Sequence, residues 1–369
     1  MNVGLITFHA AYNYGSVLQA FATQKAVCDL GNHCEIINYR FRGQKDFYRL
    51  IRLKYGLRIT LSDLIQFPVF KKKIIREQKF EKFINECLVL SSEFSEPSEL
   101  LESKLGYDIY LSGSDQIWSK YSSELYYEDW DYIDPYLLKF TKKKKIAYAS
   151  SIGSMADTDL NKIKPWISKY KHIAMRERSM ADKLSRYLGT SIEKVLDPTL
   201  LYQAEDYMNW FSLKLLQEKF ILFYSLRGPK IVNKQRHDLI QLAKQTGLKI
   251  YAITPYCYFP NNNYYKNKIE SGVEDFLQLI MNAKLIITDS FHGTALSIVF
   301  NKNFYSICRG WDTDYRKNDL LTDLGITNRS VSCISDCDIT SKIDYKQVNE
   351  KLDILRMHSF DYLKNAINN

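Results

Sequence analysis

The sequence lacks the features that mark several large classes of protein. Among its 369 residues only 15 are glycine and 8 are proline, and no internal repeat or low-complexity segment occurs. This composition excludes collagen-like, repeat and disordered chains and is typical of a globular protein. No apolar run approaches the roughly 20 residues that a membrane-spanning helix needs. The chain starts directly with a strand pattern, MNVGLI, instead of a signal peptide, so we expect a cytoplasmic protein.

Metal-binding and redox motifs are also missing. The seven cysteines include no CxxC pair, and no histidine follows a cysteine at the spacing of a zinc site. We therefore expect free thiols in a reducing compartment, and no metal. The loop after the first expected strand does not read GxGxxG, which makes a dinucleotide cofactor a weak interpretation. We expect the protein to work without a cofactor.

The net charge of +9 comes from a single segment. Residues 40–82 contain 13 Lys or Arg and 4 Asp or Glu, whereas the rest of the chain contains 38 of each sign. Because the chain is neutral outside this basic arm, we expect no nucleic-acid partner. Apolar residues are interleaved with the basic ones, as in helices that lie on an anionic membrane surface, here the inner face. The alternative is a solvated face whose apolar stripe packs on its own domain.

Apolar stretches of strand length alternate with helical patterns along most of the chain. The first example is a strand at residues 3–8, a helix at 17–27 and a strand at 34–39. A chain of this length is long for one core, and the alternation is typical of parallel sheets covered by helices on both faces. We expect an α/β fold with two doubly wound, Rossmann-like domains that face each other across a cleft.

The alternation pauses near residue 215 and restarts with a strand at 219–226. We expect a first domain over residues 1–215, with the basic arm as a helical insertion at 40–90. The second domain covers residues 216–340. Residues 341–369 contain a long amphipathic pattern, and we expect this helix to pack back on the first domain.

A polar loop follows the first expected strand. It contains Asn13, Gly15 and Ser16 just before the helix at 17–27. The N-terminus of a helix offers free N–H groups, which favours a bound anion or polar ligand there. The structural alternative is a plain turn that needs a glycine.

A second polar loop follows the expected strand at 107–111. Asp115 and Gln116 suit the hydroxyl groups of a sugar, and Trp118 offers a stacking face. The alternative is that Asp115 caps a helix N-terminus.

Two arginines stand where the expected strand at 172–176 runs into a helix. The guanidinium groups of Arg176 and Arg178 match the geometry of phosphate and carboxylate, so both are candidate anion ligands. The alternative is that an arginine pairs with Glu177 and fixes the loop.

Residues 288–295, TDSFHGTA, lie between an apolar strand pattern and an apolar helix pattern. Ligands of α/β proteins gather at the carboxyl ends of strands. His292 stands in this turn, and histidine is the side chain best suited to proton transfer near neutral pH. The alternative is that His292 only caps the helix or hydrogen-bonds within the turn.

The chain resembles the polysaccharide pyruvyl transferases in six segments that occur in the family's order. They are HAAYNYGSVLQA at 9–20, LSGSDQIW at 111–118, IAYASSIG at 146–153, MRERS at 175–179, LDPTLL at 196–201 and TDSFHGTA at 288–295. The resemblance implies a fold similar to the two-domain B-type glycosyltransferases. It also implies transfer of pyruvate from phosphoenolpyruvate onto two hydroxyls of a sugar as a cyclic ketal, during assembly of a bacterial surface or capsular polysaccharide. We expect the acceptor to be lipid-linked.

From this resemblance we predict a donor side in the second domain and an acceptor side in the first. His292 is the predicted proton donor and Arg176 the predicted clamp of the donor's carboxylate or phosphate. The other predicted donor-binding residues are Arg178, Ser290, Gly293, Thr294 and Arg316. The predicted acceptor- or substrate-binding residues are Asn13, Tyr14, Gly15, Ser16, Gln19, Ser114, Asp115 and Gln116.

One position departs from the family's pattern. Some members carry an arginine two residues before the motif histidine, and this chain has Ser290 there. Another cation must then hold the donor, and the candidates are Arg316 and the pair Arg176 and Arg178. Two other functions stay open: a glycosyltransferase that uses a nucleotide-sugar, and a non-catalytic, glycan-binding member of an assembly complex.

Overall fold

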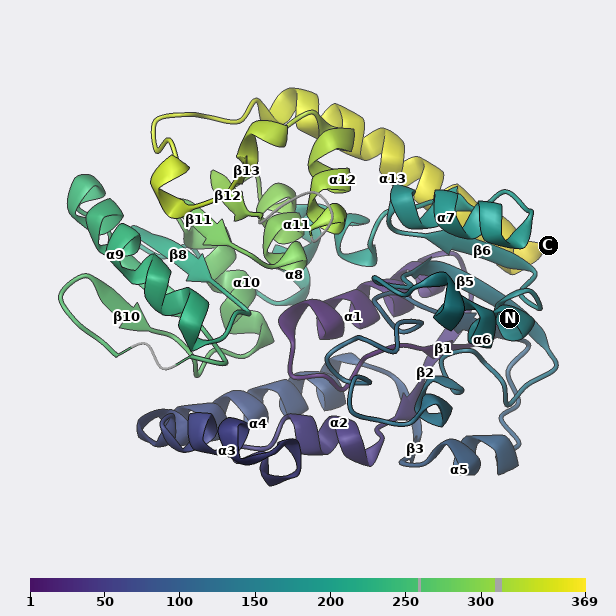
Figure 1. Ribbon diagram of the computed structural model, residues 1–369. Helices are drawn as coiled ribbons and strands as arrows, with labels where there is room; N and C mark the ends of the chain where they lie inside the picture. The colour runs from purple at the N-terminus through teal and green to yellow at the C-terminus, as the bar shows by residue number, and fades with distance from the viewer. Residues whose placement is uncertain (258–259, 309–313) are drawn as a thin grey trace. The chain divides into compact units, whose positions relative to one another are not determined.

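The computed structural model describes residues 1–257, 260–308 and 314–369 (Figure 1). Contacts between residues divide the chain into two units. The first unit contains Met1–Lys54, Glu81–Leu201 and Ile354–Asn369, and the second contains Tyr55–Phe80 and Tyr202–Asp353. Each unit is built on one sheet.

The first unit has a seven-stranded parallel sheet with the strand order β3-β2-β1-β4-β5-β6-β7. Its central strands are buried on both faces, as their continuous apolar runs predict. The strands are β1 (Asn2–Ile6), β2 (His33–Tyr39), β3 (Leu90–Phe94), β4 (Ile109–Ser112), β5 (Lys144–Ser150), β6 (His172–Met175) and β7 (Glu193–Lys194). The main helices are α1 (Tyr14–Asp29), α2 (Arg42–Phe47), α5 (Pro97–Glu102), α6 (Asp157–Ile167) and α7 (Arg178–Leu188).

The second unit has a six-stranded parallel sheet with the order β10-β9-β8-β11-β12-β13. Its strands are β8 (Phe220–Tyr224), β9 (Lys249–Ile253), β10 (Tyr265–Asn267), β11 (Leu285–Thr288), β12 (Phe304–Ile307) and β13 (Ser330–Val331). Its helices are α3 (Leu57–Leu64), α8 (Ala204–Trp210), α9 (Pro229–Thr246), α10 (Val273–Asn282), α11 (Phe291–Val299) and α12 (Tyr315–Leu324). Both sheets are parallel and doubly wound, which confirms the predicted fold class.

Two helices belong partly to each unit. Helix α4 (Phe70–Cys87) starts in the second unit and ends in the first, and α13 (Tyr345–Asn368) does the same. The last turns of α13 attach to the first unit, where the Tyr362 hydroxyl donates a hydrogen bond to the Ala147 carbonyl in β5 over 3.0 Å. Among the described residues, no helix is both long and apolar enough to cross a membrane.

The basic arm is divided differently from the expected insertion in the first domain. Its residues Tyr55–Phe80 group with the second unit, and the division in the chain falls at Leu201 instead of residue 215. Ion pairs within the second unit accompany the grouping: Lys72 Nζ lies 3.0 Å from Glu270 Oε2, and Lys79 Nζ lies 2.6 Å from Asp275 Oδ2. Each pair joins residues about 200 positions apart in sequence, which a local pattern does not reveal.

The sequence pattern does not predict two of the edge strands. Strand β3 lies largely in a polar stretch of the sequence, yet it pairs in parallel with β2. Strand β10 has only three residues and pairs with β9. Edge strands need no continuous apolar run because one side of each has no neighbouring strand.

Candidate functional site

Each sheet reverses its direction of growth at one point, and the polar loops lie there. In the first sheet the reversal falls between β1 and β4, and in the second it falls between β8 and β11. Loops leave such strands toward opposite faces and open a crevice, which is where ligands of doubly wound sheets bind. Three of the six sequence motifs follow β1, β4 and β11 directly.

In the first unit, the loop after β1 forms the start of α1. Asn13 is the N-cap, and its Oδ1 accepts a hydrogen bond from Gly15 N at 3.1 Å. Tyr14 and Ser16 are buried, and Asn13 is half-buried. Asn13 therefore has the structural role that the turn alternative predicts, while it keeps some contact with solvent.

Gln19 joins the loops that follow β1 and β4. Its Nε2 donates to Thr7 Oγ1 at 2.7 Å and to the Ser16 carbonyl at 2.8 Å, and its Oε1 accepts from Ser114 N at 3.1 Å. Thr7 Oγ1 donates in turn to the Ser114 carbonyl. Gln19 and Ser114 are fully buried. These two predicted substrate-binding residues therefore stabilise the contact between the loops that follow β1 and β4.

Asp115 lies at the centre of this network. Its Oδ2 accepts from Ser16 Oγ at 2.9 Å, and its Oδ1 accepts from Gln116 N at 2.8 Å and from Arg176 Nη2 at 3.2 Å. The chain continues as turns after Asp115, so the carboxylate does not cap a helix. Its side chain is 12% exposed and Gln116 is half-buried, which leaves these two residues the most accessible part of the loop.

The expected stacking face at Trp118 is wrong, because the indole is fully buried. Its Nε1 donates to the Tyr136 carbonyl at 3.0 Å, and its ring packs edge-on against Tyr170. The polar atom of a large buried aromatic side chain needs a partner, and Trp118 has one inside the core.

Arg176 is enclosed by three carboxylates. Its Nε lies 2.9 Å from Glu177 Oε1, its Nη1 lies 2.9 Å from Asp197 Oδ2, and its Nη2 contacts Asp115. Burial lowers the pKa of the guanidinium, but the charges of Glu177, Asp115 and Asp197 outweigh burial and raise it. With a side chain only 1% exposed, Arg176 is better suited to organise this cluster than to clamp a donor.

Arg178, two residues later, has the opposite environment. It is the first residue of α7 and is exposed. Of the two arginines in the motif, Arg178 is therefore the one that an anionic ligand can reach. Sequence reasoning missed Asp197, although it belongs to the segment LDPTLL that carried part of the family resemblance.

In the second unit, Asp289 connects the loops that follow β8 and β11. Its carboxylate accepts hydrogen bonds from the Ser225 hydroxyl and, at 2.9 Å, from Leu226 N. Burial raises the pKa of Asp289, while these hydrogen bonds and the charges of Arg227 and Lys317 oppose the rise. Asp289 thus fixes the switch point of the second sheet.

His292 lies in the first turn of α11, which starts at Phe291, whereas the apolar helix pattern in the sequence starts at Ala295. Ser290 is the N-cap, and its Oγ accepts from Gly293 N at 3.3 Å. The Thr294 hydroxyl donates to the Ser290 carbonyl at 3.0 Å. His292 is buried but retains 6% exposure, and it stands where the helix dipole favours negative charge.

Gly293 permits the close approach of α11 to the sheet. A Cβ atom at this position would lie 2.4 Å from Thr288 Oγ1 and 3.0 Å from the Tyr224 ring. Only glycine fits between the helix and the ends of β8 and β11 without moving them.

Lys317 and Arg227 act on Asp289 in this turn, and sequence reasoning found neither of them but named their neighbour Arg316. Arg316 is half-buried near the start of α12. The neighbouring Lys317 is buried, and its Nζ donates to the Asp289 carbonyl at 3.1 Å and pairs with Asp314 Oδ1 at 3.1 Å. Arg227 Nη2 lies 3.8 Å from the same Asp314 oxygen, and its side chain is 36% exposed. Arg227 lies just after the end of β8. Arg176 was selected from the sequence because it also lies at the end of a strand, so the same criterion could have found Arg227.

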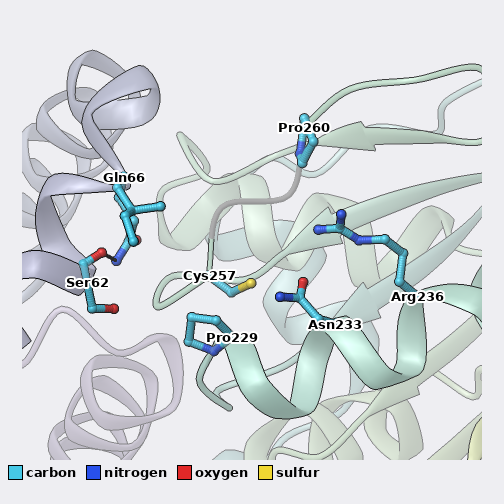
Figure 2. A pocket seen from close by; sticks show the side chains of 8 residues that line it. Ser62, Gln66, Pro229, Asn233, Arg236, Cys257 and Pro260 are labelled. Carbon is cyan, nitrogen blue, oxygen red and sulfur yellow. Dashed lines mark hydrogen bonds between the residues drawn. The ribbon is translucent and has the colours of Figure 1, made fainter. Parts of the chain in front are cut away.

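A cavity of about 330 Å³ lies elsewhere in the second unit, between α3 and α9 (Figure 2). It is lined by Ser62, Ile65, Gln66, Pro229, Asn233, Arg236, Cys257 and Pro260. None of the predicted site residues lines it. Within the described parts of the chain, no group of three His, Cys, Asp or Glu side chains is arranged to hold a metal ion.

The sequence profile of the polysaccharide pyruvyl transferase family matches residues 13–307. The chain belongs to this family. The match covers Asp115, Arg176 and His292 together with the motifs around them, and it ends before α12. Membership supports a transferase that works on polysaccharide. No protein with a curated description matches the chain in sequence.

Solved structures of other proteins are similar to this pyruvyl transferase family member over most of its length. A Listeria monocytogenes protein assigned as a UDP-N-acetylglucosamine 2-epimerase has a TM-score of 0.52 at 7% identity, over 99% of this chain and 90% of that one. UDP-GlcNAc 2-epimerase from Methanocaldococcus jannaschii covers 96% and 92%, with a TM-score of 0.49 at 11% identity. Heptosyltransferase WaaC from E. coli covers 96% and 100%, with a TM-score of 0.42 at 11% identity. The first likeness concerns the fold alone and agrees with the predicted similarity to B-type glycosyltransferases.

Proposed function

We propose that this protein transfers pyruvate from phosphoenolpyruvate to two hydroxyls of a sugar, forming a cyclic ketal in a bacterial surface or capsular polysaccharide. The observation that carries the proposal is His292 in the first turn of α11, at the switch point of the second sheet, in a member of the polysaccharide pyruvyl transferase family. A proton donor beside the N-terminus of a helix suits a substrate that is both anionic and activated by protonation.

The donor carries a phosphate and a carboxylate, so it needs cations and N–H groups. The N–H groups of Gly293 and Thr294 are bonded to Ser290, so the first turn of α11 contributes the positive end of its helix dipole. Arg227 and Arg316 are accessible enough to take the place of the arginine that is missing at Ser290. Lys317 is buried and bonded to the Asp289 carbonyl, so in this proposal it holds the turn in place.

The proposed reaction proceeds in two additions. His292 delivers a proton to the methylene carbon of phosphoenolpyruvate, which leaves a cationic centre at C2. One sugar hydroxyl attacks C2 and its proton returns to His292. Phosphate then leaves with the electrons of its C–O bond, and the second hydroxyl attacks the same carbon and gives its proton to the departing phosphate. These steps use proton transfer and phosphate departure only, so we propose no cofactor.

We propose that the sugar acceptor binds to the first unit. Asp115, Gln116 and Asn13 keep some exposure among the polar residues at the first switch point, and their oxygen and nitrogen atoms match sugar hydroxyls. We propose that the acceptor is lipid-linked. The excess of positive charge in residues 40–82 supports binding of the protein to the anionic inner face of a membrane.

The proposal is tested by replacing His292 with asparagine, which keeps the size and polarity of the side chain but removes the titratable nitrogen. Phosphate release from phosphoenolpyruvate in the presence of acceptor should fall by about 10²–10⁴-fold, the usual contribution of general acid catalysis. His237→Asn is the matched control, because His237 is exposed on α9 in the same unit. Mass spectrometry of the acceptor should show one added pyruvyl ketal for the control and the unaltered protein.

Unchanged phosphate release by a folded His292→Asn protein would rule out His292 as the proton donor. A nucleotide-sugar glycosyltransferase predicts a different outcome, namely that a nucleoside diphosphate raises the melting temperature and phosphoenolpyruvate does not. A glycan-binding protein without catalysis predicts stabilisation by the saccharide and by neither donor.

A further inference from the structure

Helix α3 and the turn that follows it bury polar side chains and expose apolar ones. The polar side chains of Asp63 and Gln66 are buried, with 1% and 2% exposure. Soluble helices normally direct apolar residues inward and leave charged ones in water. Here the exposed side chains are apolar: Leu57 (77%), Leu61 (53%), Leu64 (46%), Ile65 (71%) and Phe67 (72%).

The inward side of this segment is held by the second unit. Ser62 and Gln66 line one wall of the cavity, opposite Pro229 and Asn233 of α9 (Figure 2). Further along the arm, Lys72 and Lys79 bind the second unit through their ion pairs. Because the polar side is fixed inward, the apolar side faces outward as a consequence of the fold.

Positive charge flanks the exposed apolar side chains. Arg58 follows Leu57, and Lys71 stands four residues after Phe67; both are exposed. The two acidic residues of the segment Tyr55–Phe80 contribute little to this surface, since Asp63 is buried and Glu77 is half-buried. Exposed apolar and exposed basic side chains therefore occur together along this segment, and we call them the α3 face: Leu57, Arg58, Leu61, Leu64, Ile65, Phe67 and Lys71.

We propose that the α3 face docks on the surface of an anionic lipid bilayer. The apolar side chains enter the boundary between headgroups and acyl chains, and Arg58 and Lys71 contact the lipid phosphates. This combination of an apolar face and basic residues is the one that holds helices in the plane of a membrane interface. This inference rests on the proposed function, because docking would bring the enzyme to a lipid-linked acceptor.

Charge distinguishes a bilayer from a second copy of the chain. A two-fold contact places the same patch against itself, which would set Arg58 and Lys71 of one copy near those of the other. Like charges at such a contact oppose association, whereas an anionic surface attracts both residues. The positive charge of the α3 face therefore favours the bilayer.

The test uses the full-length protein and sedimentation with vesicles of phosphatidylcholine, with or without phosphatidylglycerol. The unaltered protein should bind the anionic vesicles in a salt-sensitive manner. The double variant Leu61→Ser/Leu64→Ser should bind at least about tenfold more weakly, since withdrawing one leucine side chain from water corresponds to a factor of about ten or more. Leu215→Ser/Met357→Ser removes two similarly exposed apolar side chains elsewhere and should bind normally.

A second measurement reports insertion directly. Tryptophan in a Phe67→Trp variant should be quenched by brominated lipids beyond the quenching of the unaltered protein. Absence of binding to anionic vesicles, equal binding by the Leu61→Ser/Leu64→Ser variant, or a dimer in light scattering that this variant dissociates would each overturn the proposal. Vesicles without donor or acceptor suffice, so failure here leaves the proposed reaction to be judged by His292→Asn alone.

Discussion

Arg176 and Arg178 stand two residues apart and differ completely in their surroundings. The first is buried among Asp115, Glu177 and Asp197, and the second is exposed at the start of α7. At the scale of single residues, burial therefore separates a group that holds the fold together from a group that a ligand can reach. The same distinction separates buried Lys317 from half-exposed Arg227 in the second unit.

Replacing Arg176 with alanine should destabilise the first unit strongly. It would leave three carboxylates buried without their cation, and breaking a buried ion pair costs about 3–5 kcal/mol. Arg178→Ala is the paired variant and should change stability by less than about 0.5 kcal/mol, because it alters an exposed side chain. Urea unfolding, with hydrogen exchange of the amides in β4 and β6, measures both. Equal stability of the two variants would contradict the structural role of Arg176.

At the scale of an element, α11 depends on its first turn. Ser290 caps the helix, Gly293 lets it approach β11, and His292 stands between them. The position at which some family members carry arginine is thus used here to start the helix. Ser290 therefore has a structural role in this chain, because its hydroxyl caps the helix.

Ser290→Ala should lower the free energy of unfolding by about 1 kcal/mol, the usual cost of losing an N-cap. Ser290→Thr should retain most of the stability, since its hydroxyl can accept the same hydrogen bond from Gly293 N. The amides of the first turn of α11 should exchange faster with solvent in the alanine variant only. Faster exchange in both variants would show that the hydroxyl is not what holds this turn.

At the scale of the whole molecule, buried histidine links stability to pH. His9 is fully buried at the end of β1, with its ring nitrogens near the Thr7 carbonyl and Asn38 Oδ1. Burial, assisted by the charge of Arg40, lowers its pKa from 6.5 to about 4 against the opposing effect of the hydrogen bonds. The folded protein therefore holds His9 neutral over a range in which the unfolded chain takes up a proton.

Stability should consequently fall as the pH drops from about 6.5 to about 4, and level off below, by about 3 kcal/mol at most from this residue. The lowered pKa of His172 acts in the same direction. Urea unfolding across this range, followed in each unit separately, measures the slope. His9→Gln should be less stable at neutral pH but lose less on acidification. Parallel curves for the two proteins would contradict the assignment to His9.

The sequence by itself determined the sheet type and the segments in which polar loops follow strands. Apolar runs of strand length, separated by helical patterns, require parallel strands covered on both faces, and this information is local. The polar loops at Asn13, Asp115 and His292 could be found for the same reason, since each follows a strand directly in the chain. Family membership followed from the same short segments.

Only the tertiary structure decided which of these residues are buried and what they contact. Ser16 and Asp115 are bonded across 99 residues of sequence, and Asp115 and Arg176 across 61. Contacts between distant segments also give Gln19 its structural role and bury Trp118 in the core. They group Tyr55–Phe80 with the second unit as well. Burial is a sum of contacts between distant segments, so no local pattern reveals that α3 exposes its leucines and buries Asp63.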